Sequence, residues 1–296
     1  MAERRLLFAL AHPDDESFGY GGVIARYVAE GVDVYLICST NGDAGTVAEE
    51  FLDGYDSVAA LRLAELDCAA AKLGLKQVFK LGYKDSGMMH SETSRDPACS
   101  WQAPPEEMAR RVVEVIRQVR PQVIVTFNAY GGYGHPDHIA IQRATALAFS
   151  LAGDPAYITP GLEPYQPQKL YHSSIPTLML RLAIARLRLA GKDPRRVGRN
   201  ADIDLVAILD HVEPTTTLVK IGDYLKDWDA ASACHASQLG GGFVRLPLFV
   251  RRLFAARQAF TRVHPPPARP RVDEHDLFAG VTLDAPQQVL HGREQS

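Results

Sequence analysis

Short apolar runs alternate with helical stretches through the first 150 residues, and this alternation limits the possible folds more than any other feature. Helical periodicity over roughly ten to eighteen residues follows each apolar run. Strands that alternate with helices in this way form βαβ units and a parallel sheet covered on both faces. The sequence therefore predicts an α/β fold, a Rossmann-like and mostly parallel sheet with helices on both faces. The apolar runs typical of buried strands are residues 6–11, 32–38, 78–81 and 123–127.

The pattern changes beyond about residue 171. Residues 179–189 have helical periodicity, whereas residues 202–209 and 217–221 alternate as strands do. A proline-rich stretch at residues 263–270 predicts an extended connection. We expect an α/β metal-hydrolase core over residues 1–172 and a smaller C-terminal subdomain, residues 173–296, that completes the catalytic unit.

Charge and hydropathy exclude several classes of protein. The formal net charge is −3, and lysine and arginine do not cluster as a nucleic-acid surface would need. No apolar run reaches the length of about 20 residues that a membrane span requires. Only a short apolar run separates Arg5 from His12, which leaves no room for the apolar part of a signal peptide, so we expect a cytoplasmic protein.

The four cysteines are far apart in the sequence and include no C-x-x-C pair. Buried or half-buried free thiols are the simplest interpretation, and they suit a reducing compartment. Any metal bound by this chain would then use nitrogen and oxygen ligands. The cysteines are Cys38, Cys68, Cys99 and Cys234.

Two motifs rich in histidine and carboxylate each follow a predicted strand. The first is His12-Pro13-Asp14-Asp15-Glu16, and the second runs from Gly131 to His138 and contains His135. Ligands of open parallel sheets bind at the carboxyl ends of the strands, so both motifs should reach one site. Adjacent carboxylates repel each other unless a cation lies between them. Two histidines and one carboxylate from these loops would make a catalytic metal site with a position open for water.

The paired motifs resemble the LmbE/PIG-L family of zinc de-N-acetylases, which includes the deacetylases of glycosylphosphatidylinositol, mycothiol and bacillithiol biosynthesis. The resemblance covers most of the first 140 residues and returns at His235-Ala236-Ser237-Gln238 and at Asp276-Leu277-Phe278-Ala279-Gly280. It implies one Zn²⁺ per chain. The loop Asn41-Gly42-Asp43-Ala44-Gly45 departs from the more acidic Gly-Glu-Glu-Gly run usual in the mycothiol enzymes.

The resemblance also implies roles for individual residues. The zinc ligands would be His12, Asp15 and His138. Asp14 would be the general base, and His135 would stabilise the oxyanion or donate a proton, assisted by Tyr133. We further expect Asp137 to orient His135 or His138 from outside the ligand set.

Sugar contacts are implied at Arg62, Asp85 and Met88, and each position has a structural alternative. Arg62 could instead pair with Glu65 on a solvated helix face. Asp85 could form a turn before Ser86-Gly87, and Met88 could serve packing alone. His235 could likewise be a core histidine.

The expected function is zinc-dependent hydrolysis of the acetamide of an N-acetylglucosaminyl conjugate, which releases acetate and a free amine. The expected partner is this small-molecule substrate. An amidase acting on a non-sugar or thiol-conjugate amide is the alternative. A nucleotide-binding dehydrogenase would need G-x-G-x-x-G after the first strand. A non-haem iron oxygenase also uses two histidines and a carboxylate, although usually on an antiparallel barrel.

Overall fold

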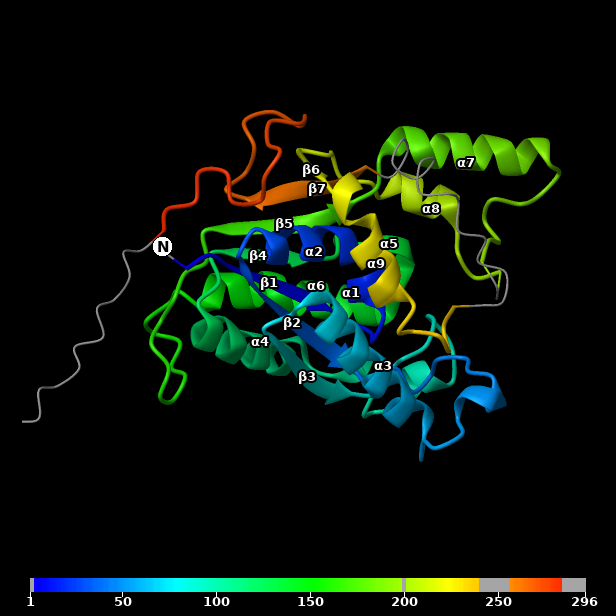
Figure 1. Cartoon of the computed structure of the whole chain (residues 1–296), viewed down its shortest axis with the longest axis horizontal. Helices are drawn as coiled ribbons and strands as arrows, with labels where there is room; N and C mark the ends of the chain where they lie inside the picture. Colours follow the sequence, from blue (N-terminus) through cyan, green and yellow to red (C-terminus); the bar gives the residue numbers. More distant parts are fainter. Residues whose placement is uncertain (1–2, 199–200, 240–255, 284–296) are drawn as a thin grey trace, which may run out of the picture.

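The computed structural model describes residues 3–198, 201–239 and 256–283 (Figure 1). Its sheet has seven strands in the order β3-β2-β1-β4-β5-β7-β6. The strands are β1 (Arg5–Leu10), β2 (Asp33–Thr40), β3 (Gln77–Tyr83), β4 (Val123–Thr126), β5 (Lys169–Ser174), β6 (Thr217–Lys220) and β7 (Arg257–His264). The first five pair in parallel, whereas β7 runs antiparallel to both β5 and β6. The predicted α/β fold with a mostly parallel sheet is confirmed.

Helices cover both faces of the sheet. One layer contains α2, α3 and α9, and the other contains α4 and α6 (Figure 1). The chain moves from β1 to β3 in one direction and returns to β4 and β5 in the other, and right-handed crossovers put the two sets of helices on opposite faces. The helices are α1 (Asp15–Phe18), α2 (Gly21–Ala29), α3 (Val58–Leu73), α4 (Pro105–Val119), α5 (Gly131–Gly134), α6 (Pro136–Leu151), α7 (Thr177–Leu189), α8 (Leu205–Asp210) and α9 (Leu225–Ser232).

The centre of the sheet forms the core. Residues 6–10 of β1 are fully buried because this strand has neighbours on both sides and helices on both faces. The strand order reverses at β1, whose neighbours are β2 and β4, so the loops after β1 and β4 meet at one edge of the sheet. The fold thereby brings the two histidine motifs together.

Residues after 173 add strands to the same sheet, because β7 pairs with β5 and β6 pairs with β7. The boundary predicted at residue 172 stays a prediction. The strand predicted at residues 202–209 is wrong, since this segment contains α8. The Asp204 carboxylate accepts hydrogen bonds from the Val206 and Ala207 N–H groups, and this N-cap favours a helix over the alternating pattern.

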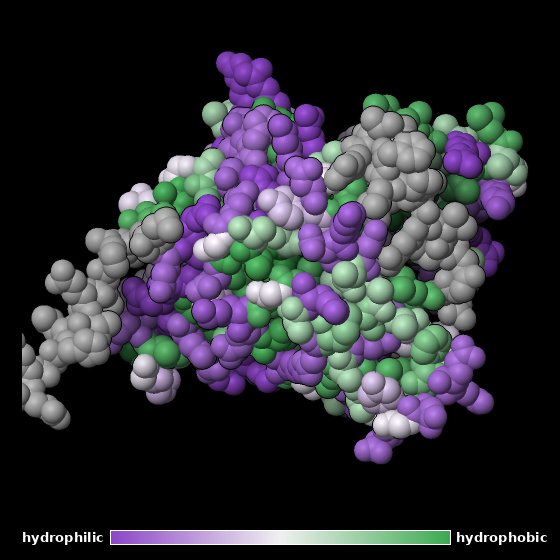
Figure 2. Space-filling view, in the orientation of Figure 1, coloured by the Kyte–Doolittle hydropathy of each residue, from purple (hydrophilic) through white to green (hydrophobic). Residues whose placement is uncertain are grey.

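Helix α7 lies at the edge of the molecule and buries only part of its surface. Leu180 and Ile184 are buried, while apolar side chains on its other side are exposed (Figure 2). The exposed set is Leu178, Met179, Leu182 and Leu189. In the described part of the chain, no helix combines the length and apolar character that a membrane span needs.

Candidate metal centre and active site

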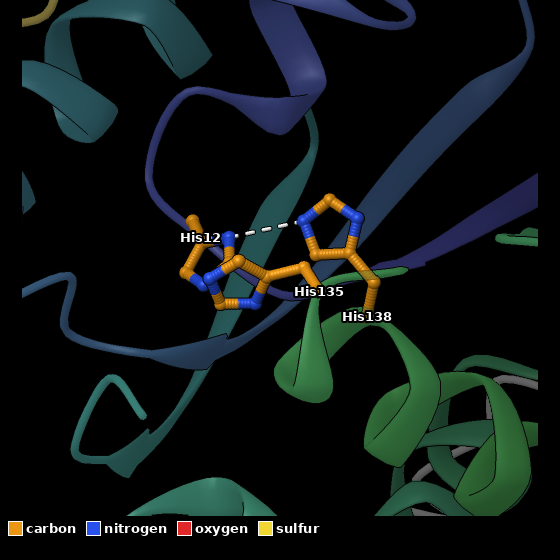
Figure 3. A group of neighbouring side chains, drawn as sticks. All are labelled: His12, His135 and His138. Carbon is orange, nitrogen blue, oxygen red and sulfur yellow. Dashed lines mark hydrogen bonds between the residues drawn. The ribbon is translucent and has the colours of Figure 1, made fainter. Parts of the chain in front are cut away.

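Three histidines converge at the sheet edge where the strand order reverses. His12 follows β1, His135 is the N-cap of α6, and His138 lies in the first turn of that helix (Figure 3). All three side chains are buried, and His12 Nδ1 lies 3.1 Å from His138 Nε2. The two motifs therefore meet at one site, as predicted from their positions after parallel strands.

Asp15 completes a triangle of potential ligand atoms with His12 and His138. Its carboxylate oxygens lie 3.6 Å from His12 Nδ1 and 3.4 Å from His138 Nε2. The N–H groups of Ala11 and His12 donate to Asp15 Oδ2 at 3.1 and 2.7 Å and fix this carboxylate. Ligand atoms about 2.0–2.1 Å from a tetrahedral zinc ion are roughly 3.3 Å apart, so the triangle has the size that such an ion needs.

His12 and His138 each have a second ring nitrogen that lies outside the triangle and contacts a protein oxygen. His138 Nδ1 lies 3.1 Å from the Gly131 carbonyl oxygen, and His12 Nε2 lies 3.1 Å from Asp137 Oδ2. A ring proton at each of these positions would donate to the neighbouring oxygen. With the ring protons at those positions, His138 Nε2 and His12 Nδ1 would keep the lone pairs with which a histidine binds a metal ion.

Asp137 contacts His135, one of the two histidines that we expected, through its backbone N–H group, whereas its carboxylate contacts His12. The carboxylate Oδ2 atom lies 3.1 Å from His12 Nε2. The carboxylate also accepts hydrogen bonds from the Ser86 N–H group at 2.9 Å, the Ser86 hydroxyl, and the Ser100 hydroxyl at 2.5 Å. Burial alone would raise the pKa of Asp137, but the hydrogen bond and charge of His12, together with His135 and the Ser100 hydroxyl, lower that pKa below its usual value. Asp137 is therefore a fixed anion that orients His12.

A second group of side chains in the described residues is also close enough to hold a metal. It consists of His12, Asp85, His135 and Asp137. Two of its members already have other partners, because Asp137 accepts from two serines and His135 Nδ1 accepts from the Asp137 N–H group at 3.2 Å. A metal held by the triangle that includes Asp15 would leave these partners of Asp137 and His135 in place.

Asp14 projects from a strained backbone position beside this triangle. Its φ angle is 143°, which residues other than glycine rarely adopt. One carboxylate oxygen lies 2.9 Å from the Arg62 guanidinium. Burial raises the pKa of Asp14 to about 7, against the lowering effect of Arg62. Asp14 can therefore exchange a proton near neutral pH.

His135 faces His12, and its ring centroid lies 4.5 Å from that of His12. Because its Nδ1 atom accepts the Asp137 N–H group, its Nε2 atom carries the proton of the neutral ring. Burial lowers the pKa of His135, and the neighbouring histidines lower it further. The Tyr133 ring lies 5.8 Å from the His135 ring, and burial raises the pKa of its phenol. Both side chains can thus act as neutral hydrogen-bond donors.

Arg62 is buried beneath the loop that follows β2, and only 3% of it is exposed. It donates to the Pro13 carbonyl oxygen at 2.6 Å and to the Gly42 carbonyl oxygen at 3.4 Å, in addition to Asp14. A surface ion pair with Glu65 is excluded because both residues are buried. Arg62 is therefore placed to hold the Asp14 carboxylate.

Asp85 and Met88 lie in the loop after β3. The Asp85 carboxylate accepts a hydrogen bond from the Gly87 N–H group at 2.8 Å, which is the expected turn, and it also lies 3.7 Å from His12 Nε2. Met88 is half-buried. Asp85 therefore both forms the turn and lies next to His12 in the site. Sugar contacts at Asp85 and Met88 stay predictions.

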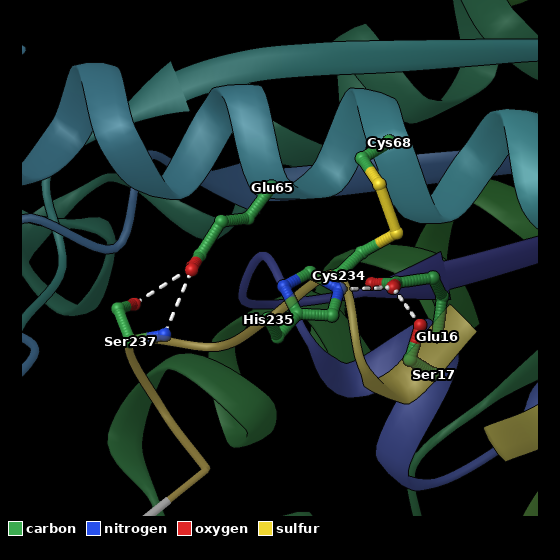
Figure 4. Close-up of a disulfide and its surroundings, with 7 residues drawn as sticks. All are labelled: Glu16, Ser17, Glu65, Cys68, Cys234, His235 and Ser237. Atoms are coloured by element: carbon green, nitrogen blue, oxygen red, sulfur yellow. Dashed lines mark hydrogen bonds and ion pairs between the residues drawn. A yellow bond between two sulfur atoms is a disulfide. The ribbon is translucent and has the colours of Figure 1, made fainter. Parts of the chain in front are cut away.

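The expectation of four free cysteines is wrong. Cys68 of α3 and Cys234 after α9 form a disulfide, with 5.8 Å between their Cα atoms (Figure 4). Cys38 and Cys99 are buried free thiols. The pair is 166 residues apart in the sequence, and only the packing of α9 against α3 brings the two together. Sequence reasoning also missed the roles of Ser86 and Ser100. Both donate hydrogen bonds to the distant Asp137 carboxylate, and no local sequence pattern marks such a contact.

Comparison with known proteins identifies the family. The protein family described as PIG-L, GlcNAc-PI de-N-acetylase, matches residues 7–149. A 1D-myo-inositol 2-acetamido-2-deoxy-alpha-D-glucopyranoside deacetylase of Thermobispora bispora is 39% identical over 95% of this chain and 100% of the relative. This chain belongs to the PIG-L family. A Thermobifida fusca protein of the same name is 37% identical over 94% of this PIG-L chain and 100% of the relative.

Solved structures share the fold of this PIG-L chain. The N,N'-diacetylchitobiose deacetylase of Pyrococcus horikoshii superimposes with a TM-score of 0.61, at 19% identity over 90% of this chain and 87% of the other. The conserved protein TT1542 of Thermus thermophilus gives a TM-score of 0.57, at 22% identity over 97% of this chain and 99% of the other. The mostly parallel sheet also differs from the antiparallel barrel expected for an iron oxygenase.

Proposed function

We propose that this protein hydrolyses the acetamide of an N-acetylglucosaminyl conjugate in a zinc-dependent reaction that releases acetate and a free amine. Similarity over nearly the whole chain to deacetylases named for 1D-myo-inositol 2-acetamido-2-deoxy-alpha-D-glucopyranoside supports this substrate. The observation that carries the proposal is the triangle of His12, Asp15 and His138, with Asp14 and His135 beside it. We assign inositol as the group attached to the sugar.

We propose zinc, one ion per chain, as the metal held by His12, Asp15 and His138. Two nitrogen ligands and one oxygen ligand with an open fourth position are the usual set of a hydrolytic zinc site. When bound, zinc would supply Lewis-acid activation of the acetamide oxygen and of a water molecule.

The protein side chains then move the protons. Asp14 accepts a proton from the attacking water as the water oxygen bonds to the acetamide carbon. The neutral His135 ring donates its Nε2 proton in a hydrogen bond to the developing oxyanion, and the Tyr133 phenol can donate a second. Asp14 then gives its proton to the amide nitrogen as the carbon–nitrogen bond breaks, so the products are acetate and the amine. The raised pKa of Asp14 suits both its basic and its acidic step.

A direct assay tests this proposal. The purified protein is stripped of metal and reloaded with zinc. It is then given the inositol conjugate, N-acetylglucosamine, N,N'-diacetylchitobiose and an N-acylated thiol conjugate, and acetate and free amine are both measured. We expect equal amounts of both products, highest kcat/KM on the inositol conjugate, and loss of activity without metal. Preferred cleavage of the thiol conjugate would support the alternative amidase, and no product from any sugar amide would overturn the proposal.

A further inference from the structure

The mechanism uses the carboxylate of Asp14 but leaves open what holds its strained backbone. A non-glycine residue in such a region costs about 1–3 kcal/mol and persists only where its surroundings enforce it. The Asp14 carbonyl oxygen accepts hydrogen bonds from the Ser17 and Phe18 N–H groups at 3.0 and 2.8 Å. Its own N–H group donates to Glu16 Oε2 at 3.1 Å. Glu16 is therefore part of the contacts that fix Asp14.

Glu16 is a fully buried carboxylate and needs partners of its own. Its Oε1 atom accepts a hydrogen bond from the Ser17 hydroxyl at 2.5 Å and lies 2.7 Å from His235 Nε2. His235 is also fully buried, although it follows Glu16 by 219 residues (Figure 4). Burial lowers the pKa of His235, but the hydrogen bond with Glu16 and the charges of the surrounding carboxylates together raise it above its usual value. His235 is thus a donor directed at Glu16.

The segment that carries His235 is anchored to α3 on both sides. Cys234 forms the disulfide with Cys68, and the Ser237 N–H and hydroxyl groups donate to the Glu65 carboxylate at 2.8 and 2.7 Å (Figure 4). These contacts immobilise the His235 backbone between two fixed points.

One face of α3 supplies all of these anchors. Arg62, Glu65 and Cys68 are spaced by three residues, so they lie along the same side of the helix. Arg62 holds the Asp14 carboxylate directly, while Glu65 and Cys68 hold the segment that contacts Glu16. Asp14 is therefore clamped at its carboxylate and at its N–H group from the same helix.

We propose that His235 and Glu16 are positioning residues for Asp14: His235 fixes the Glu16 carboxylate, and Glu16 holds the Asp14 N–H group so that the Asp14 side chain faces the reacting water. The inference rests on the proposed deacetylase function. Both side chains are fully buried, so we assign them no contact with the substrate. Because a misplacement of about 1 Å can cost roughly 100-fold in rate, loss of the His235 donor should lower kcat without removing the metal ligands.

The test uses the zinc-loaded enzyme and two variants at one position. His235→Leu removes the donor, whereas His235→Gln places an amide N–H group near the position of Nε2. We expect kcat to fall about 10- to 100-fold in the leucine variant, with zinc content unchanged and KM within about threefold. The glutamine variant should recover most of that loss, which a purely structural role of the ring would not produce.

His172→Leu is the matched control, because it removes another buried histidine that contacts a glutamate. His172 Nδ1 lies 2.9 Å from Glu213, and its other nitrogen lies 3.3 Å from the Gln142 amide. We expect this variant to lower thermal stability while its zinc-loaded folded fraction keeps a near-normal kcat.

A kcat of His235→Leu within threefold of wild type would overturn the inference. Equal kcat losses in His235→Leu and His172→Leu would also overturn it, and so would equal losses in His235→Leu and His235→Gln. If His235→Leu does not fold, Glu16→Asp makes the same test. It keeps the charge but is one methylene too short to reach both Asp14 and His235, and an unchanged kcat there would also overturn the inference. An inactive wild-type enzyme would instead contradict the proposed function.

Discussion

The contact between Asp137 and His12 leads us to expect that Asp137, although outside the proposed ligand set, affects the affinity for zinc. Four groups donate to the Asp137 carboxylate: His12 Nε2, the Ser86 N–H group, and the hydroxyls of Ser86 and Ser100. In Asp137→Asn, the amide oxygen can take the place of Oδ2, which accepts from His12 and the Ser86 N–H group. The two hydroxyls near Oδ1 can rotate and accept from the new NH₂ group. The substitution therefore keeps the shape and removes the charge.

Loss of that charge should weaken zinc binding because a carboxylate partner makes the imidazole a more basic ligand. Partners of this kind are worth about 10- to 100-fold in metal affinity, or about 1.4–2.8 kcal/mol. Competition with a chromophoric chelator measures the zinc Kd directly. Ser100→Ala is the control, since it removes one donor to Oδ1 and leaves the acceptor of His12 in place. A zinc Kd of Asp137→Asn within threefold of wild type would refute the assigned role of Asp137.

Four other features of the structure also give predictions: the His138 ligand position, Asp14, Arg62 and the disulfide. His138→Ala should lose both zinc and activity, and full metal content in the folded variant, measured by mass spectrometry, would disprove the ligand assignment. Asp14→Asn should keep zinc and lose about 10²–10⁴-fold in kcat. In the wild type, kcat/KM should rise with pH as Asp14 ionises near pH 7, the value to which burial raises its pKa, and this acidic limb should move or vanish in the asparagine variant. Arg62→Ala should reduce turnover of a sugar amide and of a simple acetamide equally if Arg62 acts through Asp14, which it contacts, whereas a selective loss on the sugar amide would support the predicted sugar contact. Replacing Cys68 and Cys234 together by serine should lower the free energy of unfolding by about 2–5 kcal/mol, since the disulfide joins residues 166 apart, and an unchanged denaturation midpoint would contradict this.

The sequence alone determined the features that depend on short-range patterns. Apolar runs and helical periodicity predicted the parallel strands and the helices between them, because burial on two faces imposes a local pattern. The position of each histidine motif after a strand placed His12 and His138 at one sheet edge, since parallel strands present their carboxyl ends together. Segment 202–209 misled the same reasoning, because an N-cap at Asp204 outweighed an alternating pattern.

Only the tertiary structure decided which side chains meet across long separations. The contacts of Asp137 with His12, of Arg62 with Asp14 and of His235 with Glu16 join residues 125, 48 and 219 positions apart. Cys68 and Cys234 are 166 residues apart, and their pairing depends on how α9 packs against α3. A residue type and its neighbours fix local conformation, but a distant partner is chosen by the packing of whole helices and strands, which no local pattern records.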